Sequence, residues 1–224
     1  MKPSFSAKLR SSIQKCGLIA VLTIDDADDA VPLALALLAG GVSAMELTLR
    51  TPVALKAIRL VKAQVPEIAL GAGTVLAAEQ VTAVSEAGAD FAVSPGFDPN
   101  IVERAMAVGL PFAPGVMTPS EVGAAIRLGC SDLKFFPAEP SGGIAMLKSI
   151  AAPFSHLGIR FIPLGGVNAD NLLSWLAVPE VTAVGGSWLA PRSLIANKDW
   201  QAITDRATAA SEIVRTTRGP GSGT

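Results

Sequence analysis

Short apolar segments alternate with longer segments of helical periodicity along almost the whole chain. The apolar segments have the length of buried strands, and the segments between them are rich in helix formers and tend to end in glycine. We expect strands at residues 18–24, 44–49, 69–74, 91–95, 111–116, 132–137, 160–165 and 181–189. The clearest helices are expected at residues 27–39, 52–64, 77–87, 100–108 and 119–128.

Eight strand-and-helix units in 224 residues predict an α/β protein with one domain, a closed (β/α)₈ TIM barrel. Residues 5–15 precede the first strand and predict an extra N-terminal helix that closes the bottom of the barrel. The alternative is an open doubly wound sheet, but the first strand runs into Thr23-Ile24-Asp25, without the glycines of a dinucleotide-binding turn. We place the barrel domain at residues 1–215. Residues 216–224, rich in Gly, Ser and Thr, are expected to form a disordered tail.

The composition excludes several classes of function. Half of the residues are apolar and the formal net charge is -1, so no excess charge attracts nucleic acid. The N-terminal residues lack the apolar core of a signal peptide, and no apolar stretch is long enough to span a bilayer. Cys16 and Cys130 fit neither a disulfide framework nor a metal-ligand spacing. We therefore expect a cytoplasmic protein with neither nucleic acid nor membrane as a partner.

Histidine chemistry is poorly supported, because His156 is the single histidine of the chain and lies in an expected loop. A catalytic triad needs a histidine base, and many zinc sites need several histidines. We expect neither a metal nor a cofactor.

Lys134 lies within an apolar run that is expected to form a strand, Asp132-Leu133-Lys134-Phe135-Phe136-Pro137. Burying an ammonium among such side chains is unfavourable and favours the neutral amine, which is the nucleophilic form. Neutral amines attack carbonyl groups and form Schiff bases. The structural alternative is that Lys134 belongs to an edge strand or extends its head to water.

Glu46 places a charge of opposite sign in a second apolar strand. Two strands that each carry one buried charge indicate a shared site, with Lys134 as the nucleophile and Glu46 as the general acid/base. The substrate that suits this pair is a 2-oxo acid, because its Schiff base is an electron sink for an aldol or retro-aldol step without a metal.

Further candidates lie at the carboxyl ends of the expected strands, where a barrel places its chemistry. Arg50 offers a planar fork for a substrate carboxylate, and Thr74 offers a hydroxyl to the same group. Alternatively, Arg50 is a solvated residue before a helix and Thr74 is a helix N-cap. Pro95, Phe136 and Leu164 are at other strand ends and are expected to line the same substrate site.

The seventh and eighth expected strands end in glycine, at Gly165-Gly166 and Gly185-Gly186-Ser187. Glycine lets backbone N–H groups approach an anion, and the N-terminus of a following helix favours negative charge. Phosphate sites after strands seven and eight recur in barrels. We interpret Gly165, Gly166, Gly186 and Ser187 as a phosphate site, the alternative being that the glycines only permit tight turns.

Seven segments of the chain resemble the 2-keto-3-deoxy-6-phosphogluconate (KDPG) and 4-hydroxy-2-oxoglutarate (KHG) aldolases. They are Glu46-Leu47-Thr48-Leu49-Arg50-Thr51, Gly71-Ala72-Gly73-Thr74-Val75-Leu76, Ser94-Pro95-Gly96, Pro114-Gly115, Leu133-Lys134-Phe135-Phe136-Pro137-Ala138-Glu139, Gly165-Gly166 and Gly185-Gly186-Ser187-Trp188-Leu189. The resemblance implies a class I, metal-independent lyase on a (β/α)₈ barrel, normally a homotrimer. Such an enzyme cleaves KDPG to pyruvate and glyceraldehyde 3-phosphate in the Entner-Doudoroff pathway, with KHG, cleaved to pyruvate and glyoxylate, as a second substrate.

The resemblance also implies a role for most of the candidates. Lys134 matches the Schiff-base lysine of the family and Glu46 its proton-transferring glutamate. The positions that line the pyruvyl portion are Arg50, Thr74 and Phe136, and those of the phosphate cup are Gly165, Gly166, Gly186 and Ser187.

Leu164 departs from the family pattern. Many gluconate-type members carry a threonine just before the glycine pair, where its hydroxyl faces the hydroxyls of the substrate, and leucine cannot form such a hydrogen bond. The related galactonate-type aldolases are apolar there but do not usually carry arginine at position 50, so this chain is mixed. We expect relaxed discrimination between the two epimers. The alternatives are a galactonate-epimer aldolase and a non-catalytic sugar-phosphate-binding barrel, and Lys134 together with Glu46 argues against the latter.

Overall fold

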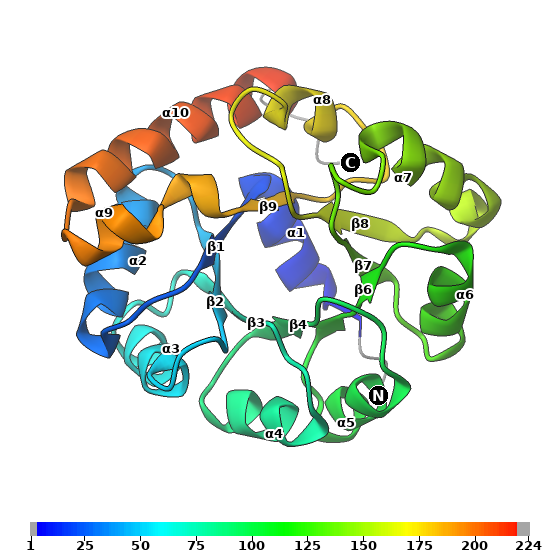
Figure 1. Cartoon of the computed structure of the whole chain (residues 1–224), viewed down its shortest axis with the longest axis horizontal. Coiled ribbons are helices and arrows are strands. Elements are labelled where there is room, and N and C mark those ends of the chain that lie inside the picture. The colour runs from blue at the N-terminus through cyan, green and yellow to red at the C-terminus, as the bar shows by residue number, and fades with distance from the viewer. Residues whose placement is uncertain (1–3, 219–224) are drawn as a thin grey trace.

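Parallel strands alternate with helices through the computed structural model, which describes residues 4–218 (Figure 1). The strands are β1 (Leu18–Leu22), β2 (Ala44–Thr48), β3 (Ala69–Gly73), β4 (Phe91–Val93), β5 (Phe112–Ala113), β6 (Gly115–Val116), β7 (Asp132–Phe135), β8 (Arg160–Pro163) and β9 (Val184–Gly186). Each expected strand therefore contains at least one short strand of the structure.

Except for the first helix, at residues 7–16, the α-helices surround the strands (Figure 1). The α-helices are α1 (Ala7–Cys16), α2 (Ala30–Ala39), α3 (Ala54–Gln64), α4 (Ala78–Glu86), α5 (Pro99–Val108), α6 (Pro119–Arg127), α7 (Gly143–Ala151), α8 (Leu172–Leu176), α9 (Arg192–Ala196) and α10 (Trp200–Arg218). The 3₁₀ helices are η1 (Ala27–Asp29), η2 (Ala152–Leu157) and η3 (Ser187–Leu189). Local capping fixes some starts: at α6, Thr118 and Glu121 form a reciprocal capping box, followed by proline in the first turn.

Within the described residues the strands form two parallel sheets. One has the order β5-β4-β3-β2-β1-β9 and the other the order β6-β7-β8. Pro114 separates β5 from β6, which the sequence pattern predicts as one strand, and its carbonyl accepts a hydrogen bond of 2.9 Å from the Lys134 backbone N–H. Isolated parallel bridges join Phe161 to Val181 and Leu164 to Gly185, so β8 also contacts the segment that contains β9.

The apolar core has two parts. The larger part fills the space between helices and strands, with Leu33, Val61 and Phe135 among its fully buried side chains. The smaller part contains Phe5 and Phe91, whose ring centroids are 5.3 Å apart. Residues before and within α1 therefore pack against side chains of the strands, and Figure 1 shows α1 near the centre of the ring of helices.

A buried carboxylate holds α1 to the amino end of β7. Asp132 is 1 % exposed, accepts hydrogen bonds of 2.8 and 2.6 Å from the Arg10 guanidinium, and accepts another from the Phe5 backbone N–H. This hydrogen bonding raises the pKa of Arg10 above its ordinary value. The paired charge explains how an aspartate is accommodated at the start of an apolar strand.

Two expectations about the C-terminal part of the chain are wrong. The eighth apolar run forms a strand only at β9 and then turns into η3, because Gly186 leaves space for the Trp188 ring, which a Cβ at residue 186 would overlap. The predicted tail begins within α10, which continues to Arg218 because Val214 packs on the core and the Thr217 hydroxyl bonds to the Ile213 carbonyl. The rest of that tail, 219–224, lies outside the described residues.

Candidate active site

Lys134 on β7 and Glu46 on β2 face each other inside the molecule. The Lys134 Nζ atom lies 3.5 Å from Oε1 of Glu46, and the two residues are 5 % and 1 % exposed. The Phe136 ring centroid is 5.4 Å from the same Nζ atom. Strand β7 pairs with a neighbour on each side, β6 and β8, so the edge-strand and solvent-exposed alternatives for Lys134 are wrong.

An inner cavity of about 190 Å³ surrounds this pair. All the residues predicted for the site line it: Glu46, Arg50, Thr74, Pro95, Lys134, Phe136, Leu164, Gly165, Gly166, Gly186 and Ser187. Val21, Thr23, Thr48, Val167 and Gly185 complete the lining. The structure therefore gathers candidates from six strands and the loops that follow them around one space.

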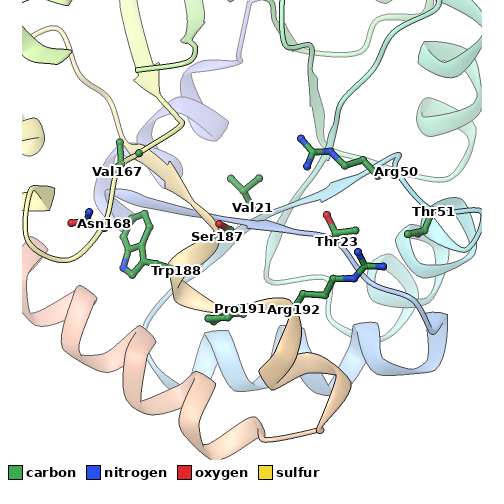
Figure 2. Close-up of a pocket in the computed structure, with 12 residues that line it drawn as sticks. Val21, Thr23, Arg50, Thr51, Val167, Asn168, Ser187, Trp188, Pro191 and Arg192 are labelled. Atoms are coloured by element: carbon green, nitrogen blue, oxygen red, sulfur yellow. The ribbon is translucent and has the colours of Figure 1, made fainter. Parts of the chain in front are cut away.

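An outer cavity of about 650 Å³ adjoins the inner one. Figure 2 shows the residues that line the outer cavity. The two share Val21, Thr23, Arg50, Gly166, Val167 and Ser187. The outer cavity is also lined by Asn168, Trp188 and Arg192. A ligand can therefore extend from Lys134 past Ser187 toward the surface.

Backbone geometry supports a functional role for Thr74. Its φ angle is 58°, a left-handed conformation that is strained for a residue with a branched side chain. Thr74 is not a helix N-cap, because α4 starts at Ala78 and its N-cap is Ala77. Arg50 is exposed, as the solvated alternative expected, and it nevertheless lines both cavities.

The loop that follows β8 is built on two glycines with positive φ, Gly165 at 92° and Gly166 at 84°. A Cβ at residue 166 would lie 2.5 Å from the Glu139 Cβ, so glycine is also required for space. Glu139 accepts hydrogen bonds from Trp175 Nε1, at 2.7 Å, and Asn171 Nδ2, at 3.1 Å, and the Asn171 amide also donates to the Gly166 carbonyl. Glu139 therefore fixes the position of this glycine loop.

The sequence of the chain matches a family of known enzymes. The family model described as KDPG and KHG aldolase matches residues 9–206. The chain belongs to this family. A 2-dehydro-3-deoxy-phosphogluconate aldolase of Treponema pallidum is 41% identical over 203 residues, 91% of this chain and 96% of that protein. A KHG/KDPG aldolase of Escherichia coli K12 is 43% identical over 195 residues, 87% of this chain and 91% of that protein.

A solved KDPG aldolase of Legionella pneumophila, described with pyruvate captured as a covalent carbinolamine intermediate, has a TM-score of 0.86 and 40% identity. The match covers 90% of this chain and 97% of that one. The fold of this KDPG and KHG aldolase family member is thus that of an enzyme in which pyruvate forms a covalent adduct. The family resemblance that the sequence motifs indicated is confirmed.

Leu164 is the position at which this aldolase family member departs from the expected threonine. It is 4 % exposed and lines the inner cavity. A Cβ at Gly185 would lie 2.5 Å from the Leu164 Cγ, so the glycine of the neighbouring strand makes room for the leucine. This part of the wall is apolar.

Arg192 of the outer cavity forms an ion pair with Asp25. Arg192 donates to Asp25 through Nε, at 2.8 Å, and through Nη2, and this pairing lowers the pKa of Asp25 and raises that of Arg192. Among residues 4–218, no three His, Cys, Asp or Glu side chains are close enough to one another to hold a metal ion. None of the described helices is long and apolar enough to cross a membrane.

Some residues of the site were missed by sequence reasoning. Thr23 directly follows β1, and the rule that barrel chemistry lies at strand ends would have found it. Nothing in the local sequence marks Gly73 as a site residue. It matters because it lies against the Glu46 carboxylate, which belongs to another strand. Arg192 lies in α9, for which the pattern predicted no element.

Proposed function

We propose that this protein is a class I aldolase, an aldehyde-lyase that cleaves KDPG to pyruvate and glyceraldehyde 3-phosphate. The observation that carries the proposal is the contact of 3.5 Å between Lys134 Nζ and Glu46 Oε1, both buried, in a cavity that extends to a glycine-rich loop. The relatives from Treponema pallidum and Escherichia coli are named as aldolases of KDPG, which supports KDPG as the substrate. A sugar-phosphate-binding barrel without catalysis would need neither of the two charged residues.

The first step forms the Schiff base. Glu46 is close enough to the Lys134 ammonium to accept its proton. The neutral amine then attacks the C2 carbonyl of the substrate to give a carbinolamine. The Glu46 carboxyl returns its proton to the carbinolamine hydroxyl, which leaves as water, so a protonated imine remains at Nζ and Glu46 is again a carboxylate.

Carbon–carbon cleavage follows. The C4 hydroxyl loses its proton to the Glu46 carboxylate or to a water beside it, the C3–C4 bond breaks, and its electron pair moves into the imine to give an enamine. Glyceraldehyde 3-phosphate leaves as the aldehyde. Protonation of the enamine at C3 by the Glu46 carboxyl, followed by hydrolysis of the imine, releases pyruvate and regenerates the Lys134 amine.

The remaining site residues bind the two ends of the substrate. Arg50 and Thr74 suit the carboxylate of the pyruvyl portion, and Phe136 and Pro95 pack beside it. The phosphate is bound by Gly165, Gly166, Gly186 and Ser187, of which Gly166 and Ser187 line both cavities. The substrate thus lies with its pyruvyl end in the inner cavity and its phosphate end toward the outer cavity.

Two observations favour additional substrates. The Escherichia coli relative carries the names of both KHG and KDPG aldolase, which supports cleavage of KHG to pyruvate and glyoxylate. The apolar Leu164 removes a hydrogen-bonding group from the wall, which supports activity toward the galactonate epimer.

The architecture proposed with this function is a closed (β/α)₈ barrel at residues 1–215. It is supported by parallel pairing within both sheets, by the bridges between Leu164 and Gly185 and between Phe161 and Val181, and by the packing of α1 and Phe5 against the strand interior. We further propose a homotrimer, which rests on the family resemblance and is tested by light scattering on the purified protein. We also propose a cytoplasmic location, which rests on the two cysteines that fit no disulfide framework.

Borohydride trapping tests the proposed function. Incubation with pyruvate and borohydride is expected to leave a reduced adduct on Lys134, detected by peptide mass spectrometry. Lys148, on the helix α7, is the internal control and is expected to stay unmodified. An unmodified Lys134 in protein that has bound pyruvate would refute the Schiff-base mechanism.

A further inference from the structure

Thr23 lies where the inner and outer cavities join. It follows the last residue of β1 and is among the residues that line both spaces. Figure 2 shows it in the lining of the outer cavity. Lys134 and Glu46 line only the inner cavity, whereas Trp188 and Asn168 line only the outer one. Thr23 therefore stands beside the path between the reacting carbon atoms and the phosphate.

The hydroxyl of Thr23 is held by a second threonine. Thr23 Oγ1 and Thr48 Oγ1 are 2.8 Å apart, and Thr48 is 3 % exposed whereas Thr23 is half-buried. Two hydroxyls carry two protons, and their mutual hydrogen bond uses one of them. A further proton and several lone pairs of the pair are available to a ligand. Thr23 is the member that faces both cavities.

The strand register sets the height of this pair above the reacting groups. Val21 pairs with Glu46 and Leu22 with Leu47, so Thr23 and Thr48 are two residues further along the same two strands. Side chains two residues apart point to the same face of a strand. The threonine pair thus forms the next layer beyond Glu46 toward the outer cavity.

We propose that the Thr23 hydroxyl binds the C5 hydroxyl of KDPG and so determines specificity for acceptors that are hydroxylated next to the aldehyde. The inference rests on the proposed function, which puts C2 on Lys134 and the C6 phosphate at Gly166 and Ser187. C5 is the carbon between the cleaved C3–C4 bond and the phosphate, and Thr23 occupies the corresponding part of the site. The side chain of Leu164, which also lines the inner cavity, cannot form a hydrogen bond to this hydroxyl.

The aldol direction provides the test. Pyruvate is added to D-glyceraldehyde 3-phosphate or to 3-oxopropyl phosphate, which has the same aldehyde and phosphate and lacks only the hydroxyl. The ratio of kcat/KM for the two acceptors is measured for the parent, for Thr23→Val and Thr23→Ala, and for Thr23→Ser. Thr82→Val is the matched control, because Thr82 is on α4, outside both cavities, and its hydroxyl bonds to Arg104.

We expect the parent to prefer the hydroxylated acceptor by about tenfold or more. Thr23→Val and Thr23→Ala are expected to abolish this preference, because they slow only the reaction of glyceraldehyde 3-phosphate. Thr23→Ser and Thr82→Val are expected to retain the preference. Borohydride trapping with pyruvate reports which Thr23 variants are folded, and the ratio is taken from those. An unchanged ratio, or an equal loss with both acceptors, overturns the role of Thr23. A parent that produces no aldol product from either acceptor refutes the proposed function instead.

Discussion

Gly73 provides the space that the Glu46 carboxylate occupies. A Cβ at residue 73 would overlap Oε1 of Glu46 and lie 2.5 Å from its Cδ. The two residues are on neighbouring strands, since Thr48 of β2 pairs with Gly73 of β3. Gly73 therefore decides where the proposed acid/base group can stand.

Gly73→Ala is expected to displace the Glu46 carboxylate from Lys134 and to lower kcat by about 100-fold, as a misplacement of about 1 Å can do. Pyruvate adduct formation should slow less, because Lys134 itself is not displaced. Steady-state kinetics and borohydride trapping measure the two effects. Gly123→Ala on α6, where a Cβ meets nothing closer than 3.7 Å, is the control. Full activity of Gly73→Ala would show that the position of Glu46 is not critical.

Glu46→Gln keeps the shape of the side chain and removes its capacity to accept a proton. We expect kcat to fall by about 10²- to 10⁴-fold while borohydride still traps pyruvate on Lys134. Unchanged turnover would remove Glu46 from the mechanism.

Leu164→Thr introduces a hydroxyl into the apolar wall of the inner cavity. In the parent, the kcat/KM values for the gluconate and galactonate epimers are expected to be similar, and the substitution should separate them by about tenfold. Kinetics with both epimers measure the ratio. A strong gluconate preference in the parent would contradict the prediction.

Asp132→Asn removes the charge partner of Arg10 at the amino end of β7. We expect the free energy of unfolding to fall by about 2 kcal/mol, because buried hydrogen bonds to a charged group are lost. Urea unfolding measures it. Asp28→Asn is the control, since the pair of Asp28 with Lys56 is exposed and is worth less than about 1 kcal/mol. Equal losses of unfolding free energy in the two variants would show that the buried Asp132–Arg10 pair stabilises the fold no more than an exposed pair does.

The Cys130 thiol is expected to be unreactive in the folded protein. Burial, together with the nearby Asp132 charge, raises its pKa from 9.0 to about 12. An alkylating reagent near pH 9 should therefore label Cys130 in urea but not in the native state, as read by peptide mass spectrometry. Rapid native labelling would contradict the raised pKa.

The same shift predicts a pH dependence of stability. The unfolded thiol loses its proton above pH 9 while the folded one keeps it up to about pH 12. Stability contributed by Cys130 is thus complete below pH 9 and falls by at most about 1.4 kcal/mol per pH unit above it. Cys130→Ala should show a shallower loss of unfolding free energy over this range than the parent, and parallel curves would refute the prediction.

Local sequence determined the strands and the chemically important residues. Apolar runs that alternate with helical periods place β1 to β8 within a few residues, because each run must be buried on both faces of a helix-covered parallel sheet. Lys134 and Glu46 stand out for the same reason, since a charge in such a run requires a partner or a function.

Tertiary structure decided what depends on distances between strands. Lys134 and Glu46 are 88 residues apart and belong to different sheets, and only the packing of the two sheets brings their side chains to 3.5 Å. The space for Glu46 at Gly73 and the contact of Thr23 with Thr48 arise in the same way, from neighbours that no local pattern specifies. Sequence by itself thus determined which residues are available for chemistry. Packing determined their geometry, because the atoms that fix each position belong to other strands.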